Sequence, residues 1–71
     1  MRTDIVAPLP GRVIEIRVRP GEFIRSGQTV AVLEAMKMDN ELTAEADGIV
    51  TAVNVNAGDF VSFGTTLVTL E

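Results

Sequence analysis

The chain repeats itself once, without a gap. Residues 7–34 align with residues 44–71 when each residue number is raised by 37. Three glycines, a phenylalanine and several aliphatic residues recur in register, and the identical pairs are Ala7/Ala44, Gly11/Gly48, Val13/Val50, Val18/Val55, Gly21/Gly58, Phe23/Phe60, Gly27/Gly64, Thr29/Thr66, Leu33/Leu70 and Glu34/Glu71. A solenoid needs at least three repeats to bury a continuous core. Two copies must instead close on each other, which predicts a single domain over residues 1–71 with a pseudo-twofold axis.

Each copy has the pattern of short strands joined by turns. Ile14, Ile16 and Val18 alternate with charged residues, which is the period-two signal of a half-buried strand. The pair Pro20-Gly21 suits the central positions of a type II turn. About eight strands are expected, at 4–7, 14–18, 23–24, 29–34, 41–44, 53–55, 60–61 and 66–70. They are too closely spaced for helices, so we predict an all-β fold: a flattened antiparallel β-barrel or sandwich of two four-stranded sheets.

The composition limits the chemistry that the chain can perform. Its 71 residues are near the lower limit for a single core, and they include no Cys, His, Tyr or Trp. Aliphatic residues must therefore supply the core, and neither a His/Cys metal site nor a thiol nucleophile is possible. Ser26 and Ser62 have no His to activate them. We expect a domain without a catalytic site of its own.

The charge and the N-terminal segment narrow the possible partners and the location. A net charge of −4 disfavours nucleic acid as a partner. No apolar run resembles a signal peptide or a membrane span, so we expect a cytoplasmic domain without direct membrane insertion. Residues 1–37 have six basic and four acidic side chains, whereas residues 38–71 have six acidic and none basic. This asymmetry fits either a solvated surface that maintains solubility or an acidic face that steers docking onto a basic partner.

The segment VLEAMKMDNE, residues 32–41, joins the two copies and has an unusual turn. A tight hairpin normally contains Asn-Gly, Asp-Gly or Pro. Here the centre is Met36-Lys37-Met38, and Lys37 is the only lysine in the chain. A hairpin lysine is most simply a solubilising side chain. Its place at the junction of the copies, between two apolar residues, instead favours a surface that another protein reads, with both methionines exposed.

At these residues the sequence resembles a known family. The motif EAMKM resembles the biotin-attachment motif of biotinyl domains, the carriers of biotin-dependent carboxylases and decarboxylases. The resemblance extends over essentially the whole chain, from APLPG at 7–11 through the glycine turns to DGIV and GDFV in the second copy. It implies that Lys37 receives biotin through an amide bond and that the hairpin 34–41 is the attachment hairpin. The motif residues that it assigns to recognition by a biotin protein ligase are Glu34, Ala35, Met36 and Met38.

The resemblance also implies a function. Such a domain carries carboxybiotin between a biotin carboxylase and a carboxyltransferase or decarboxylase, and catalyses neither reaction alone. Lipoyl domains are similar in fold, but they usually have an acidic residue before the lysine and a small residue after it. Met36 and Met38 stand there in this chain, which favours biotin. A purely structural biotinyl-like domain, as in membrane-fusion adaptors, needs no modified lysine, and the intact AMKM argues against it.

One turn refines the resemblance further. Arg19–Glu22 equals its counterpart Asn56–Asp59 in length, which leaves no room for the protruding thumb of some bacterial acetyl-CoA carboxylase carriers. The chain is therefore similar to the thumbless carriers of pyruvate, propionyl-CoA and related carboxylases, transcarboxylases and decarboxylases. The Ala/Pro-rich linker that often precedes such domains is missing, so the sequence fits an excised domain and a free-standing carrier equally.

Overall fold

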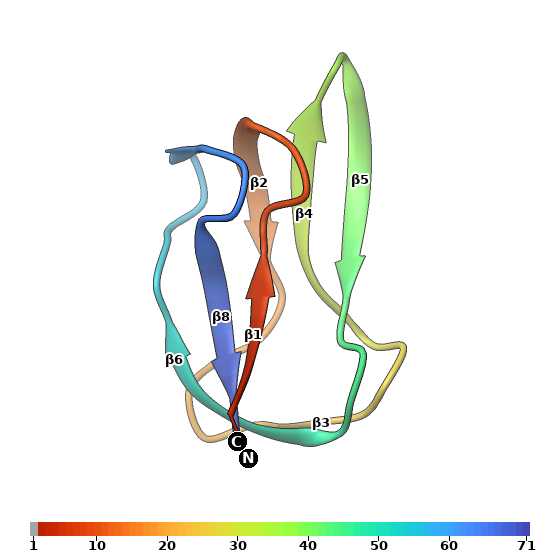
Figure 1. Cartoon of the computed structure of the whole chain (residues 1–71), viewed down its shortest axis with the longest axis vertical. Coiled ribbons are helices and arrows are strands. Elements are labelled where there is room, and N and C mark those ends of the chain that lie inside the picture. The colour runs from red at the N-terminus through yellow and green to blue at the C-terminus, as the bar shows by residue number, and fades with distance from the viewer. Residues whose placement is uncertain (1) are drawn as a thin grey trace.

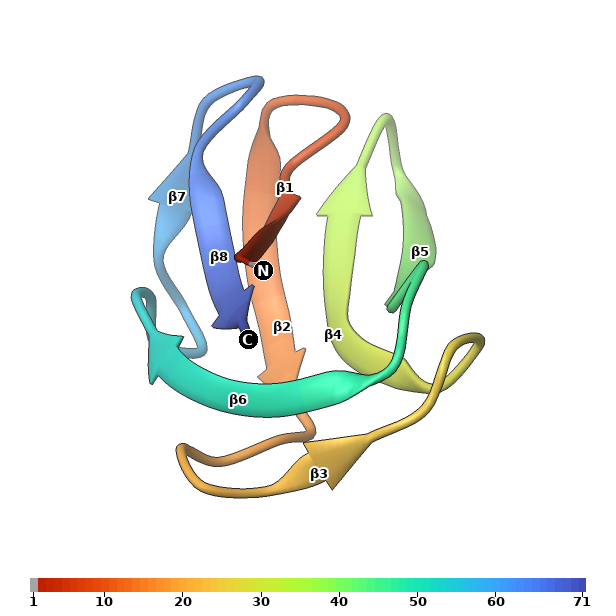
Figure 2. The same cartoon turned by 60° about the horizontal axis from the view of Figure 1, so that its bottom comes forward.

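Eight strands form two antiparallel sheets in the computed structural model, which describes residues 2–71 (Figure 1). The strands are β1 (Thr3–Val6), β2 (Gly11–Ile16), β3 (Phe23–Ile24), β4 (Thr29–Ala35), β5 (Met38–Thr43), β6 (Gly48–Val53), β7 (Phe60–Val61) and β8 (Thr66–Leu70). One sheet has the order β1-β8-β6-β3 and the other β5-β4-β2-β7 (Figure 2). The predicted sandwich of two four-stranded sheets is confirmed. Within the described residues, no helix is long and apolar enough to cross a membrane.

The two sheets are copies of each other, as the sequence repeat predicts. Raising residue numbers by 37 maps β2 onto β6 and β3 onto β7 residue for residue, and it places β1 on β5 and β4 on β8. The same operation converts the strand order of one sheet into that of the other. Even the irregularities repeat: the register shifts at Ile14 and Thr51, and again at Val30 and Leu67. The fold therefore has the predicted pseudo-twofold axis.

The glycine turns also recur in both halves. Gly21 has φ 92°, and the N–H of Glu22 donates to the carbonyl of Arg19 at 3.1 Å. In the second half, Gly58 has φ 97° and the N–H of Asp59 donates to the carbonyl of Asn56 at 3.0 Å. A positive φ at the third position is the requirement of a type II turn, so the predicted turn type is confirmed. The two turns are also equal in size, as predicted.

Three strands begin earlier than predicted. The strand expected at 14–18 is β2 (Gly11–Ile16), the one expected at 41–44 is β5 (Met38–Thr43), and the one expected at 53–55 is β6 (Gly48–Val53). The bounds of β1 and β4 differ from the prediction by one residue. In β2 and β6 the cause is the bulge at Ile14 and its equivalent at Thr51, because each places one extra residue between two inward-facing positions. Val13 is consequently deep in the core, while Val18 is buried from the loop that follows β2. A strict period of two does not detect such an insertion.

The core lies between the two sheets and is built from matched positions of the two copies. Its most deeply buried large side chains, each less than 2% exposed, are Ile24, Leu33, Leu67, Leu70, Val13, Val30, Val50 and Val68. Most of these residues are partners in the repeat. Each copy thus provides half of a core that it could not close alone.

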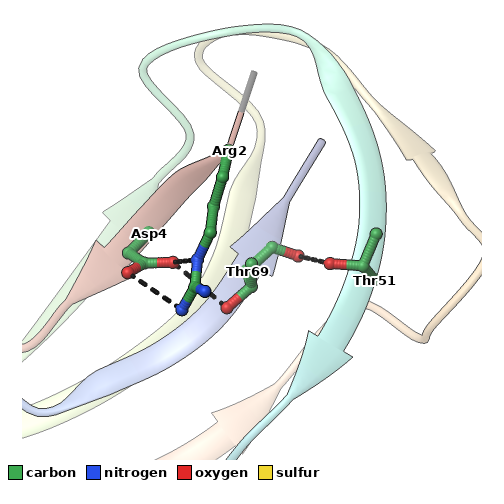
Figure 3. A network of polar contacts seen from close by, with 4 residues as sticks. All are labelled: Arg2, Asp4, Thr51 and Thr69. Carbon is green, nitrogen blue, oxygen red and sulfur yellow. Dashed lines mark hydrogen bonds and ion pairs between the residues drawn. The ribbon is translucent and has the colours of Figure 1, made fainter.

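A network of hydrogen bonds connects the edge strand β1 to its sheet (Figure 3). Thr69 is the one buried polar residue within the described chain; its hydroxyl donates to Asp4 Oδ1 at 3.2 Å, and its carbonyl accepts from Thr51 Oγ1 at 3.3 Å. Arg2 Nε donates to Asp4 Oδ1 at 3.0 Å. The hydrogen bond from Arg2 lowers the pKa of Asp4 against an opposing desolvation effect, and Thr69 lowers it further. The network thereby connects β1, β8 and β6.

Candidate functional site

The hairpin β4–β5 carries the predicted site and extends at the end of the molecule opposite the termini (Figure 1). Ala35 pairs with Met38, so the loop contains two residues, Met36 and Lys37. Their φ values are 53° and 63°. A two-residue loop with positive φ at both positions is the signature of a type I′ turn, which normally uses Asn-Gly. The turn thus has the usual hairpin geometry but is built from residues that disfavour it.

Strand pairing holds this turn in place. The β4–β5 ladder continues from the pair Glu34–Asp39 back to Thr29–Thr43. Asn40 adds a clamp at its base, because its side-chain amide donates to the carbonyl of Leu33 at 3.2 Å and to that of Met38 at 3.1 Å. The sequence prediction did not include Asn40. Its partners are set by the strand register, which the local pattern does not reveal.

The five motif residues face different environments. Met36 and Met38 are 82% and 66% exposed, so their predicted exposure is confirmed, and Lys37 is exposed between them. Glu34 is half-buried. Ala35, by contrast, is only 4% exposed and belongs to the core cluster. A partner protein therefore has access to Met36, Lys37 and Met38, while Ala35 contributes to packing beneath them.

The ammonium group of Lys37 has no ion-pair partner and no side-chain hydrogen bond within residues 2–71. The carboxylate of Glu34, which is nearby in the motif, lies 3.5 Å from the guanidinium of Arg12. Modification of the Lys37 amine would therefore break no interaction in the fold. Among the described residues, no group of His, Cys, Asp and Glu has the arrangement of a metal site.

A shallow depression of about 350 Å³ lies beside the hairpin. It is lined by Pro10, Gly11, Arg12, Glu34, Ala35, Met36, Lys37 and Phe60. Arg12 and Phe60 were not among the predicted site residues. Arg12 pairs with Glu34 on β4 and with Phe60 on β7, so the three lie in one row across the sheet. The row places an aromatic ring and a guanidinium close to the only lysine.

Comparison with known proteins identifies the family of the chain. Residues 3–70 match the family model described as "Biotin-requiring enzyme". The chain is 54% identical over 41 residues to the 2-oxoglutarate carboxylase large subunit of Hydrogenobacter thermophilus, covering 58% of the chain and 6% of that relative. It is 41% identical over 45 residues to the methylmalonyl-CoA decarboxylase subunit gamma of Veillonella parvula, covering 63% of the chain and 35% of that relative.

Solved structures show the same similarity. A single-chain, multi-domain long-chain acyl-CoA carboxylase superposes with a TM-score of 0.89 at 32% identity, over 96% of this chain and 7% of that one. The urea carboxylase of Kluyveromyces lactis gives a TM-score of 0.92 at 22% identity, over 100% of this chain and 6% of that one, and supports the fold alone. The chain spans about a third or less of the length of these relatives. With a family match over nearly its whole length, the chain belongs to the family of biotin-requiring enzymes, as a biotin carboxyl carrier domain.

Proposed function

We propose that Lys37 Nζ is the atom to which biotin is attached. The observation that supports this most directly is the exposed, unpaired amine at the tip of a rigid two-residue hairpin. An enzyme can reach this amine without unfolding the domain. Met36 and Met38 flank it with apolar surface that a biotin protein ligase can contact.

The attachment is an acyl transfer to nitrogen. Lys37 Nζ loses a proton and attacks the carbonyl carbon of an activated biotinyl group; an amide bond forms and the activating group leaves with the electrons of the broken bond. The composition includes no His or Cys that could act as the base. We therefore expect the ligase to assist the deprotonation of the amine. The product has one positive charge fewer, and the fold loses no ion pair, so the residues present fit the cofactor.

The role of the chain is to present the attached biotin and to let it reach the active sites of partner enzymes. When attached, the biotin supplies the ureido nitrogen that carries the carboxyl group. The hairpin presents Lys37 as an exposed side chain at its tip, and tethering keeps a high local concentration at successive active sites. We infer that the domain serves a biotin carboxylase and a carboxyltransferase or decarboxylase, performs neither half-reaction itself and works in the cytoplasm. The carboxylases and decarboxylase among its relatives support these partners.

The decisive experiment is co-expression with a biotin protein ligase, followed by intact mass measurement. We expect a single added biotinyl group on the chain and none on Lys37→Arg, which keeps the positive charge but does not form the amide. An unchanged mass for the chain itself, or loading of the arginine variant, would refute Lys37 as the site.

Lipoylation provides the matched specificity test. A lipoyl ligase should load the chain poorly, because Met36 stands where lipoyl domains usually carry an acidic residue. Efficient lipoylation combined with absent biotinylation would reverse the cofactor assignment.

A further inference from the structure

The pseudo-twofold axis supplies an internal comparison for the surface beside Lys37. Phe60 on β7 and Phe23 on β3 are equivalent residues of the two copies. Phe23 is 51% exposed, and the guanidinium of Arg25 lies 5.7 Å from its ring centroid. Phe60 is 83% exposed, because Ser62 occupies the position equivalent to Arg25. Of these two equivalent phenylalanines, the one at the lysine end is therefore the more exposed.

The two phenylalanines also differ in the residue that each pairs with on the neighbouring strand. Phe23 pairs with Ile49, whereas Phe60 pairs with the residue equivalent to Ile49, which is Arg12. The lysine end thus combines an open aromatic ring with a guanidinium, and both line the depression that Lys37 also lines. At the other end of the molecule, the equivalent strands β3 and β6 pair Phe23 with the aliphatic Ile49 instead.

Arg12 has hydrogen-bonding capacity to spare. Its Nη2 lies 3.5 Å from Glu34 Oε1, and its side chain is half-exposed. Within residues 2–71 the guanidinium makes no side-chain hydrogen bond. A guanidinium has five N–H donors, so several remain available for a neutral carbonyl oxygen.

Distance favours a ligand carried by Lys37. Phe60 and Glu34 lie on strands that flank β2, so two strand spacings, about 10 Å, separate their positions. Lys37 is three residues beyond Glu34 and lines the same depression as Phe60. A lysine stem extended by a flexible acyl chain covers that distance. We propose that the depression formed by Arg12, Met36 and Phe60 is a resting site for the ring system of the attached biotin. The ring would stack on Phe60, and Arg12 would donate to the ureido carbonyl.

Tethering makes even a weak site relevant. Short flexible linkers give effective concentrations of about 1 mM. A site with a dissociation constant of about 1 mM would then be occupied about half of the time. An open depression with one aromatic face and one donor is suited to that weak range. For the rest of the time, the arm would be free to reach partner enzymes.

This inference rests on the proposed attachment at Lys37, and the experiment separates the two. The chain is labelled with ¹⁵N, loaded by the ligase and checked by mass, and amide spectra of the loaded and unloaded domains are compared. We expect shifts at Arg12, Phe60 and Val61 as well as in the hairpin, with nuclear Overhauser contacts between the Phe60 ring and the biotin ring. Phe60→Ala should confine the shifts to the hairpin, whereas the matched Phe23→Ala should leave the pattern unchanged.

A second readout measures the free fraction of the arm. Capture of the loaded domain by avidin requires the ring to be free, so removal of the resting state should raise the capture rate about twofold in Phe60→Ala. Phe23→Ala should be captured at the rate of the parent. A loaded domain with shifts only at the hairpin and equal capture rates would overturn the resting site and leave the attachment intact. Failure to load at all would overturn both.

Discussion

Met36 and Lys37 both adopt left-handed backbone conformations that side chains normally disfavour. For an ordinary residue this region costs about 1–2 kcal/mol, while Asn and Gly enter it more easily. The strain is maintained by the β4–β5 ladder and by the clamp from Asn40. A long apolar side chain and an amine thus occupy the exposed tip, where stability alone would favour Asn-Gly.

Met36→Asn should therefore stabilise the domain. Relief of the left-handed strain should raise the free energy of unfolding by about 1 kcal/mol, which corresponds to a rise in Tm of about 4–8 °C for a domain of this size. Thermal unfolding of the purified variant measures the change. Met38→Asn is the matched control, because Met38 begins β5 without a positive φ and Asn is disfavoured in strands. A Tm for Met36→Asn no higher than for Met38→Asn would contradict the strain argument.

Two elements, β2 and β4, position the hairpin through a close backbone approach. A Cβ added at Gly11 would overlap the carbonyl oxygen of Glu34 on β4. At the equivalent Gly48, the nearest atom would be the carbonyl oxygen of Glu71 at 3.1 Å, at the chain terminus. The same sequence position is therefore tighter under the hairpin than under the terminus. Only a residue without a side chain permits β2 to support the base of the hairpin.

Gly11→Ala and Gly48→Ala should consequently differ in stability. The overlap at Gly11 involves backbone atoms of a paired strand, so its alanine variant should lose about 3 kcal/mol, the upper end for overpacking. At Gly48 the neighbouring atoms need to move by only a few tenths of an ångström, so that variant should lose about 1 kcal/mol. Urea unfolding measures both. Equal losses, or a greater loss at Gly48, would show that the close approach at Gly11 is unimportant.

The edge strand β1 is attached by a titratable contact. The pKa of Asp4 lies below its ordinary value of 3.8, chiefly because Arg2 hydrogen-bonds its carboxylate. A lowered folded pKa means that this contribution to stability is present above the unfolded pKa and is lost as pH falls through the folded pKa. Asp4→Asn should thus have a lower Tm than the parent at pH 7, and the difference should shrink as the pH falls below about 4.

Thermal unfolding over a pH series tests this contact. Arg2→Gln should reproduce the effect, since it removes the main cause of the lowered pKa. A difference between the parent and Asp4→Asn that is constant from neutral to acid pH would exclude the ionised carboxylate as its origin.

Across the whole molecule, folding mixes charges that the sequence separates. The acidic half follows the hairpin, but β5 returns beside β4 and close to β2. Arg17 of the basic half lies 3.8 Å from Glu41 of the acidic half, and the N–H of Ser26 donates to Asp47 at 2.7 Å. The acidic side chains therefore share their surface with groups from the basic half. This arrangement supports the interpretation of a solvated surface over that of a steering face.

Biotinylation should accordingly depend weakly on salt. Electrostatic steering raises association rates about 10- to 1,000-fold at low ionic strength, and such effects are screened by salt. Between about 0.05 M and about 0.5 M salt, we expect the ligation rate to fall by less than about tenfold. Ligation kinetics under subsaturating domain concentrations provide the measurement. A larger fall would restore the acidic face as a docking determinant.

Much of the fold was readable from the sequence because the repeat is a strong constraint. The recurrence of Gly21 and Gly58 predicted the turns, and the alternation from Ile14 to Val18 predicted a strand. The junction of the copies predicted an exposed Lys37 with exposed methionines. These features are local, or they follow from symmetry, so no knowledge of distant contacts is needed.

Other features required the folded chain, because they depend on which strands are neighbours and in what register. The bulge at Ile14 decides which side chains of β2 face the core. Pairing across three strands brings Phe60 and Arg12 toward Lys37, although Phe60 is distant in sequence. The motif indicates Lys37 as the amine that we propose is modified. The register of β7, β2 and β4 determines the surface that the modified arm meets, since cross-strand contacts arise only after the two copies have closed.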